Sequence, residues 1–163
     1  LAVDMEWAFA QSDIDIKDRI PRTRIDLVLV DTIPNEQGMN DIYLAELKVG
    51  TVATEGTSGT IDHVEKTFRL INTEKACQDF KEDVTNIINV KSELGIYTGT
   101  AKQFNLADKP KMMLILAYRG EEEHKRLLKD STAAQEKAKE LGMDEMAKSE
   151  HAHPLGAVQS THF

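Results

Sequence analysis

The sequence predicts an α/β protein, a three-layer sandwich in which helices flank a central mixed β-sheet. Two observations predict this class. Apolar runs of strand length, residues 24–30, 42–49 and 111–118, are bounded by turn-forming residues. After the second run, apolar residues recur at the three- and four-residue spacing of a helix. The expected order is helix, three strands, helix, strand, helix (αβββαβα).

The first three elements are expected within residues 1–31. Val3, Trp7 and Ala10 share a face at helical spacing, which predicts a short helix over residues 1–11 with Glu6 near the edge of that face. Residues 12–20 alternate in polarity, and a turn then leads into the run that begins at Arg24. These two segments predict a β-hairpin.

The middle of the chain is expected to add a strand and a long helix. The strand at residues 42–49 follows a polar loop, which indicates another antiparallel step, and residues 50–60 are rich in Gly, Thr and Ser and predict a mobile surface loop. Helical spacing then extends from residue 61 to Gly95, a natural stop. Asn72 and Thr73 are cap-type residues, which allows a break in this helix.

The last strand and helix are expected between Pro110 and Gly142. Residues 111–118 contain six consecutive apolar residues, 112–117, and predict a buried strand. The acids at 121–123 then open a helix, as the helix dipole favours. Residues 144–163 have no firm period and predict a loosely ordered tail, so residues 1–143 form the expected domain.

Composition narrows the function classes. At 163 residues, with 40% hydrophobic residues, the chain is long enough for one globular domain. Its apolar runs are shorter than the ~20 residues that span a bilayer, so no membrane partner is expected. The single cysteine, Cys77, excludes an internal disulfide and favours a reducing, cytoplasmic location. The net charge of −8 argues against a domain that binds nucleic acid over a large surface, but it leaves open a site that contacts phosphate through bound cations.

Charged residues inside the apolar runs are the main functional indication. Asp26 interrupts the first run, and Glu46 and Lys48 end the second. Side chains alternate along a strand, so Glu46 and Lys48 are expected on one face, within reach of Asp26 if the two strands pair. Other acid-x-Lys triplets of this chain lie in polar or helical segments. Buried charges of this kind indicate a metal or catalytic site.

With Asp26 on the second strand and Glu46-Leu47-Lys48 on the third, the chain resembles the PD-(D/E)XK nuclease-like superfamily over residues 1–141. Members of that superfamily keep an acid on the second core strand and (Asp/Glu)-x-Lys on the third, and many add a Glu on the first helix. Glu6 matches that last position. The Pro-Asp pair is absent, because Ile25 precedes Asp26. Glu82 also stands where a Tyr accompanies the Gln of the RecB-like subgroup, so that subgroup is not assigned.

The resemblance implies Mg²⁺-dependent hydrolysis of phosphodiester bonds in nucleic acid, with Mn²⁺ as a substitute and DNA as the expected substrate. It implies that Asp26, Glu46 and the Leu47 carbonyl hold the metal. It also implies that Lys48 orients water or neutralises charge in the transition state, and that Glu6 assists.

Three further residues are expected to contact nucleic acid. Arg22 and Arg24 belong to the most basic segment and adjoin Asp26, and Gln78 matches a Gln that some members carry on the helix after the Lys. Each has a simpler interpretation, because hairpin tips and exposed helix faces are usually only solvated. His63 is expected in the core or in solvent.

Two other interpretations stay open. The domain could be a catalytically silent nuclease-like fold that is used for nucleic-acid binding or assembly. Alternatively, the charges could form a buried structural network without a reaction. The sequence also leaves open whether the protein forms a homodimer or has additional domains in a longer chain.

Overall fold

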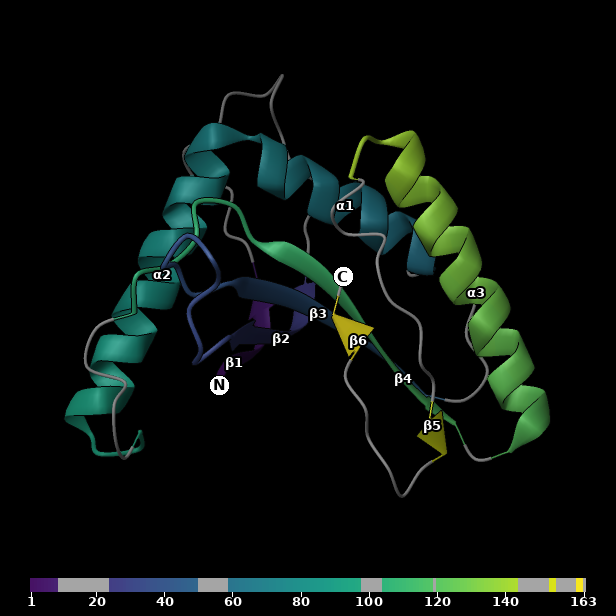
Figure 1. Ribbon diagram of the computed structural model, residues 1–163, viewed down its shortest axis with the longest axis horizontal. Helices are drawn as coiled ribbons and strands as arrows, with labels where there is room; N and C mark the ends of the chain where they lie inside the picture. Colours follow the sequence, from purple (N-terminus) through teal and green to yellow (C-terminus); the bar gives the residue numbers. More distant parts are fainter. Residues whose placement is uncertain are drawn as a thin grey trace. The chain divides into compact units, whose positions relative to one another are not determined.

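A computed structural model of the chain describes residues 1–8, 24–49, 59–97, 104–118, 120–143, 153–154 and 161–162 (Figure 1). The elements are β1 (Ala2–Ala8), β2 (Arg24–Val30), β3 (Ile42–Val49), α1 (Thr60–Asn72), α2 (Glu74–Glu93), β4 (Lys111–Tyr118), α3 (Glu121–Glu140), β5 (His153–Pro154) and β6 (Thr161–His162). The strands form one sheet in the order β1-β2-β3-β4-β5, with β6 paired to β4.

The fold class is α/β, as predicted. The sheet is mixed, because β1 and β2 are antiparallel whereas β4 and β5 are parallel. Strands β2, β3 and β4 coincide with the three apolar runs, and α3 begins at the predicted Glu121. These elements are consistent with a three-layer sandwich, but the expected order αβββαβα is not confirmed. The chain divides into two compact units, Leu1–Leu44 with Leu70–Lys111, and Ala45–Arg69 with Met112–Phe163.

The predicted N-terminal helix is wrong, because Ala2–Ala8 form strand β1. A spacing of four residues fits one helical face, but it is also an even number and therefore fits one face of a strand. Val3 and Trp7 are both buried in β1. Pairing with β2 supplies the backbone hydrogen bonds that a helix would have made within itself. Tertiary contacts therefore decide between the helical and the strand pattern.

The partner of β2 also differs from the expected hairpin. Strand β2 pairs with β1, in a register that includes Met5 with Leu27 and Trp7 with Ile25. Residues 12–20, the expected partner, lie outside the described residues. The register places Glu6 opposite Asp26, and Glu6 has a positive φ of 54°.

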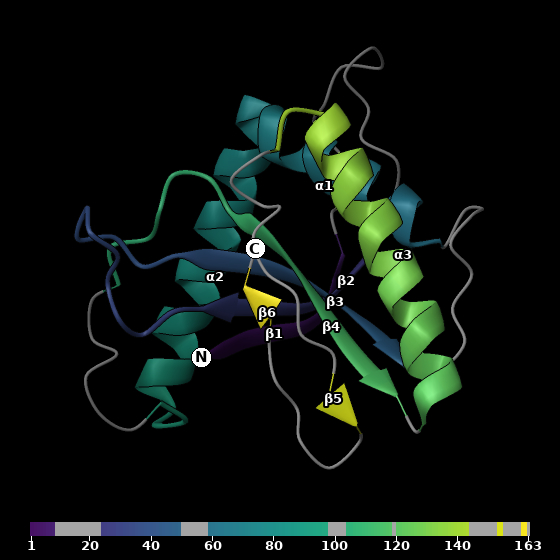
Figure 2. The ribbon, with the colours of Figure 1, turned by 45° about the vertical axis from the view of Figure 1, so that its right-hand side comes forward.

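Helix α2 covers β1 in the first unit (Figure 2). Its buried residues include Phe80, whose ring meets Trp7 edge-on at a centroid distance of 4.8 Å. At the other end of α2, Lys91 donates to the Val3 carbonyl and Tyr97 donates to the Ala2 carbonyl at 2.8 Å. These contacts secure β1 along its length.

A buried polar cluster fastens the loop before β3 to the segment before β4. The Asn40 side chain accepts from the Asn105 backbone N–H and donates to the Asp31 carbonyl, both at 3.0 Å. Asp41, which is 8% exposed, accepts from Lys111 Nζ at 2.6 Å and from Asn35 at 3.0 Å. Because each of these oxygens has a donor, burying them costs little.

In the second unit, α3 packs against β4 and contacts α1. Leu127 of α3 is fully buried in a cluster with Leu114, Leu116 and Tyr118 of β4. Helices α1 and α3 lie side by side (Figures 1 and 2), and Lys137 Nζ lies 3.1 Å from Glu65 of α1. Residues 153–154 and 161–162, within the expected tail, pair with β4.

The helix ends follow the sequence signals. The long helical segment is broken where Asn72 and Thr73 allowed it, and Thr73 is the extended N-cap residue of α2. Gly95 and Gly142 follow α2 and α3 with φ of 67° and 76°, a conformation that glycine adopts without steric cost. None of the three described helices combines the length and apolar character needed to span a membrane.

Candidate functional site

The end of β3 buries a charged pair. Glu46 and Lys48 are buried, whereas Leu47 and Val49 between and after them are exposed. This alternation confirms that Glu46 and Lys48 share one face of the strand. Lys48 Nζ donates to Glu46 Oε1 at 2.6 Å, and the two side chains are only 11% and 7% exposed. A short contact between buried opposite charges is a strong, charge-assisted hydrogen bond.

His63 is the third member of this cluster. It lies in the first turn of α1, and its Nδ1 is 3.1 Å from Glu46 Oε2. Each carboxylate oxygen of Glu46 therefore has its own nitrogen partner, one from β3 and one from α1. We refer to Glu46, Lys48 and His63 as the β3–α1 triad.

Sequence reasoning missed His63 as a functional residue. The signal that could have identified His63 is its position on a buried face of the helix. Three residues on that face, at positions i−3, i+4 and i+7 from His63, are buried: Thr60, Thr67 and Leu70. A titratable side chain on a buried stripe needs a partner. The sequence alone could not say that Glu46 is that partner, because the two residues belong to different elements.

The triad places a buried carboxylate between two nitrogen groups. A buried carboxylate is costly unless cations or hydrogen-bond donors compensate it, and Lys48 and His63 both do so. Such a group can ligate a hard cation or orient a polar substrate. Lys48 is the group that can offer positive charge to an anion.

Asp26 and Glu6 lie in the first unit, on neighbouring strands. Asp26 is half-buried in the middle of β2, and Glu6 is exposed on β1. The helical position predicted for Glu6 is therefore wrong, although the β1–β2 register still sets it opposite Asp26. Glu46 belongs to the second unit, so the meeting of Asp26 with Glu46 stays a prediction of the sequence.

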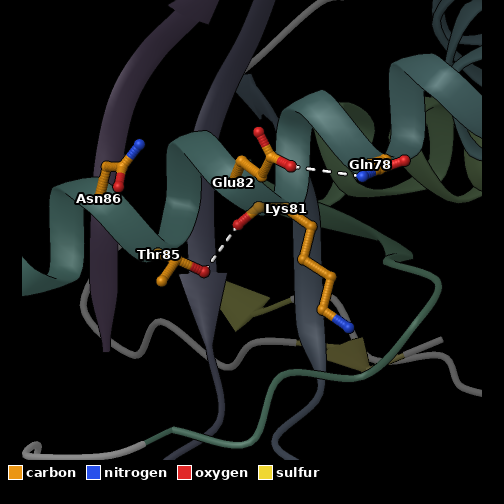
Figure 3. A pocket seen from close by; sticks show the side chains of 5 residues that line it. All are labelled: Gln78, Lys81, Glu82, Thr85 and Asn86. Atoms are coloured by element: carbon orange, nitrogen blue, oxygen red, sulfur yellow. Dashed lines mark hydrogen bonds between the residues drawn. The ribbon is translucent and has the colours of Figure 1, made fainter.

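Of the three residues expected to contact nucleic acid, Arg24 and Gln78 lie in the described part of the chain, on different elements. Arg22 lies outside the described residues, and Arg24 is the exposed first residue of β2. Gln78 lines a pocket on α2 together with Lys81, Glu82, Thr85 and Asn86 (Figure 3). Its amide donates to Glu82 at 3.3 Å, and Lys81 pairs with Asp108 at 3.0 Å. Several polar groups of this pocket are thus engaged by neighbouring side chains.

Cys77 is a buried residue of α2. The thiol is buried on α2 and contacts the Asp108 carbonyl at 3.5 Å. Burial raises the pKa of Cys77, and this outweighs the opposing charges of Lys109 and Lys81. A thiol with a raised pKa is a poor nucleophile at neutral pH.

The triad offers only part of the donor set that a divalent cation needs. Within the described ranges, no three His, Cys, Asp or Glu side chains gather into a group that could hold a metal ion. The oxygens of Glu46 and of the Leu47 backbone are nevertheless hard donors of the kind that Mg²⁺ prefers, and Leu47 is exposed beside them. The chemistry of these two donors suits Mg²⁺, but they are fewer than the ligands that such an ion needs.

Comparison with known proteins does not assign this chain to a family. No family model, curated protein or solved structure matches this chain. The triad therefore has to be interpreted from its own chemistry.

Proposed function

We propose that this domain is a metal-dependent nuclease that hydrolyses phosphodiester bonds, with DNA as its substrate. The observation that carries the proposal is the buried Glu46–Lys48 pair at the end of β3. It puts an acid and an ammonium side by side on one face of a strand, a combination that suits phosphodiester hydrolysis. The resemblance of the sequence to PD-(D/E)XK nucleases supports the same reaction.

Each residue has a distinct role in this proposal. Asp26, Glu46 and the Leu47 carbonyl would hold Mg²⁺, which when bound would supply Lewis-acid activation of water and of the phosphate. Lys48 would orient the attacking water or stabilise the negative charge of the transition state. For that, its ammonium must exchange at least part of its contact with Glu46 for a contact with substrate. Glu6, opposite Asp26 on the neighbouring strand, would assist from the exposed side.

A catalytically silent nuclease-like domain is the second candidate, and one observation favours it. Lys48 and Glu46 already satisfy each other at 2.6 Å, as a structural ion pair would. The net charge of −8 also weakens any broad electrostatic attraction to DNA. In this case the domain would bind nucleic acid or assemble with partners without cutting.

The test is cleavage of plasmid, linear duplex, single-stranded DNA and RNA with Mg²⁺ and with Mn²⁺. Wild type is compared with Lys48→Met, which keeps the aliphatic stem and removes the ammonium. Lys66→Met is the matched control, because Lys66 is also an ion-paired lysine of the second unit, with Asp62 as its partner. We expect wild type and Lys66→Met to cleave, and Lys48→Met to lose about 100-fold or more in rate.

The outcomes separate the two candidates. Equal cleavage by wild type and Lys48→Met would refute the proposed role of Lys48. Binding of labelled DNA without cleavage, measured by fluorescence anisotropy, would support the silent domain. Absence of both would leave the triad as a structural network.

A further inference from the structure

The carboxylate of Glu46 is held at both oxygens, by residues from two elements. Lys48 reaches Oε1 along the strand, at 2.6 Å. His63 reaches Oε2 from α1, with its Nδ1 at 3.1 Å. A glutamate has three rotatable side-chain bonds, so one contact leaves freedom about the carboxylate that a second contact removes.

The position of His63 is in turn set by α1. The backbone N–H of His63 donates to the Gly59 carbonyl at 3.2 Å, which is the bond of the first helical turn. Val64 and Leu70 are buried on the same helix, at 1% and 0% exposure. A packed helix is a more rigid support for a side chain than a loop, and rigid support is what a precisely placed ligand requires.

We propose that His63 is a positioning residue that holds the Glu46 carboxylate in the orientation used by the reaction. The inference rests on the proposed nuclease function for its catalytic consequence. A neutral imidazole with its proton on Nδ1 and a charged imidazolium can both donate to Oε2, so the role does not need a charged histidine. Lys48 then serves the reaction while His63 keeps Glu46 in place.

Removing a positioning residue and removing a packing residue have different consequences. Partners that orient a metal-ligating side chain cost about 10–100-fold in metal affinity or activity when they are removed. A packing residue would instead affect stability and leave the carboxylate orientation of surviving folded molecules unchanged. The donor atom, rather than the ring, should therefore be the property that matters.

The test uses His63→Leu, which removes the donor, and His63→Asn, whose amide nitrogen can replace Nδ1. His124→Leu is the matched control, because His124 is a half-buried histidine of α3 that stacks on Tyr118 in the same unit. The first readout is the Glu46 Cδ resonance in protein with ¹³C-labelled glutamate, assigned with Glu46→Gln. It needs neither metal nor activity.

We expect His63→Leu to displace the Glu46 resonance, and His63→Asn and His124→Leu to leave it near the wild-type position. On DNA, His63→Leu should lower kcat about 10–100-fold with little change in KM, and His63→Asn should recover most of the loss. An unchanged Glu46 resonance in His63→Leu would overturn the proposal. So would an equal effect of the Asn and Leu variants.

Different results would refute the nuclease function and the positioning role of His63. If wild type cleaves nothing while the Glu46 resonance responds to His63→Leu and recovers in His63→Asn, the nuclease function fails and the positioning contact stands. If wild type cleaves and His63→Leu keeps the wild-type kcat and resonance, the nuclease function stands and the role of His63 falls.

Discussion

Breaking the Glu46–Lys48 pair from one side should destabilise the protein strongly. In Lys48→Met the carboxylate of Glu46 stays buried, 7% exposed, and loses the partner that lies at 2.6 Å. Removing one member of a buried pair typically costs about 3–5 kcal/mol. His63 still contacts the other oxygen, so we expect the lower end, about 3 kcal/mol, which corresponds to a fall in Tm of about 6–12 °C for a chain of this size.

The double variant Glu46→Gln/Lys48→Met tests the cause of that loss. It removes both charges and keeps both side-chain shapes, so no uncompensated charge is buried. We expect it to recover about 2 kcal/mol relative to Lys48→Met alone. Lys75→Met is the control, since Lys75 pairs with Asp79 on the surface at 56% exposure, where the cost should stay under about 0.5 kcal/mol.

The assay is urea unfolding followed by far-ultraviolet circular dichroism, with thermal melts alongside. Two results would refute the reasoning. One is a loss in Lys48→Met no larger than that in Lys75→Met. The other is a double variant as unstable as the sum of its two single variants, which would mean that Glu46 and Lys48 do not interact.

Three further predictions concern metal, the buried polar cluster and alkaline pH. Mn²⁺ at about 100 times its Kd should stabilise wild type by about 2.7 kcal/mol, and Glu46→Gln should lose that shift in differential scanning fluorimetry; an equal shift in both would place the metal elsewhere. Asn40→Ala should cost about 1–3 kcal/mol in urea unfolding, because the Asn105 N–H loses its acceptor, and a cost near zero would contradict the stabilising role of this cluster. Burial, followed by the charge of Asp41, raises the pKa of Tyr43 above 10.0. The folded state then keeps a proton that the unfolded chain loses, so stability is retained below about pH 10 and falls above it. In Tyr43→Phe the unfolding free energy should fall less steeply with rising pH above about pH 10 than in wild type. If the two proteins show the same slope of unfolding free energy against pH, Tyr43 is not the cause of the decline.

The strands and helices with one unambiguous period were predictable. Residues 112–117 are all apolar, the run is bounded by Pro110 and Gly120, and it lies within β4. The helix after Gly120 begins with three acids and ends before Gly142, as α3 does. In these segments local propensity and burial favour the same structure, so no tertiary information was needed.

The N-terminal segment shows where such prediction fails. Val3 and Trp7 are four residues apart, and both a helix and a strand place such a pair on one side. Strand β2 resolves the choice by pairing with β1, and Trp7 then meets Phe80 of α2. Neither partner is visible in the local pattern, because both are distant in sequence.

For the candidate site, the sequence by itself determined that Glu46 and Lys48 share a face, because alternation along a strand is a local property. Only the tertiary structure decided that Lys48 pairs with Glu46 and that His63 takes the other carboxylate oxygen. Helix α1 carries His63 to β3 across 17 residues of chain, counted from position 46 to position 63. Contacts over such a separation depend on how elements pack, and no local period encodes them.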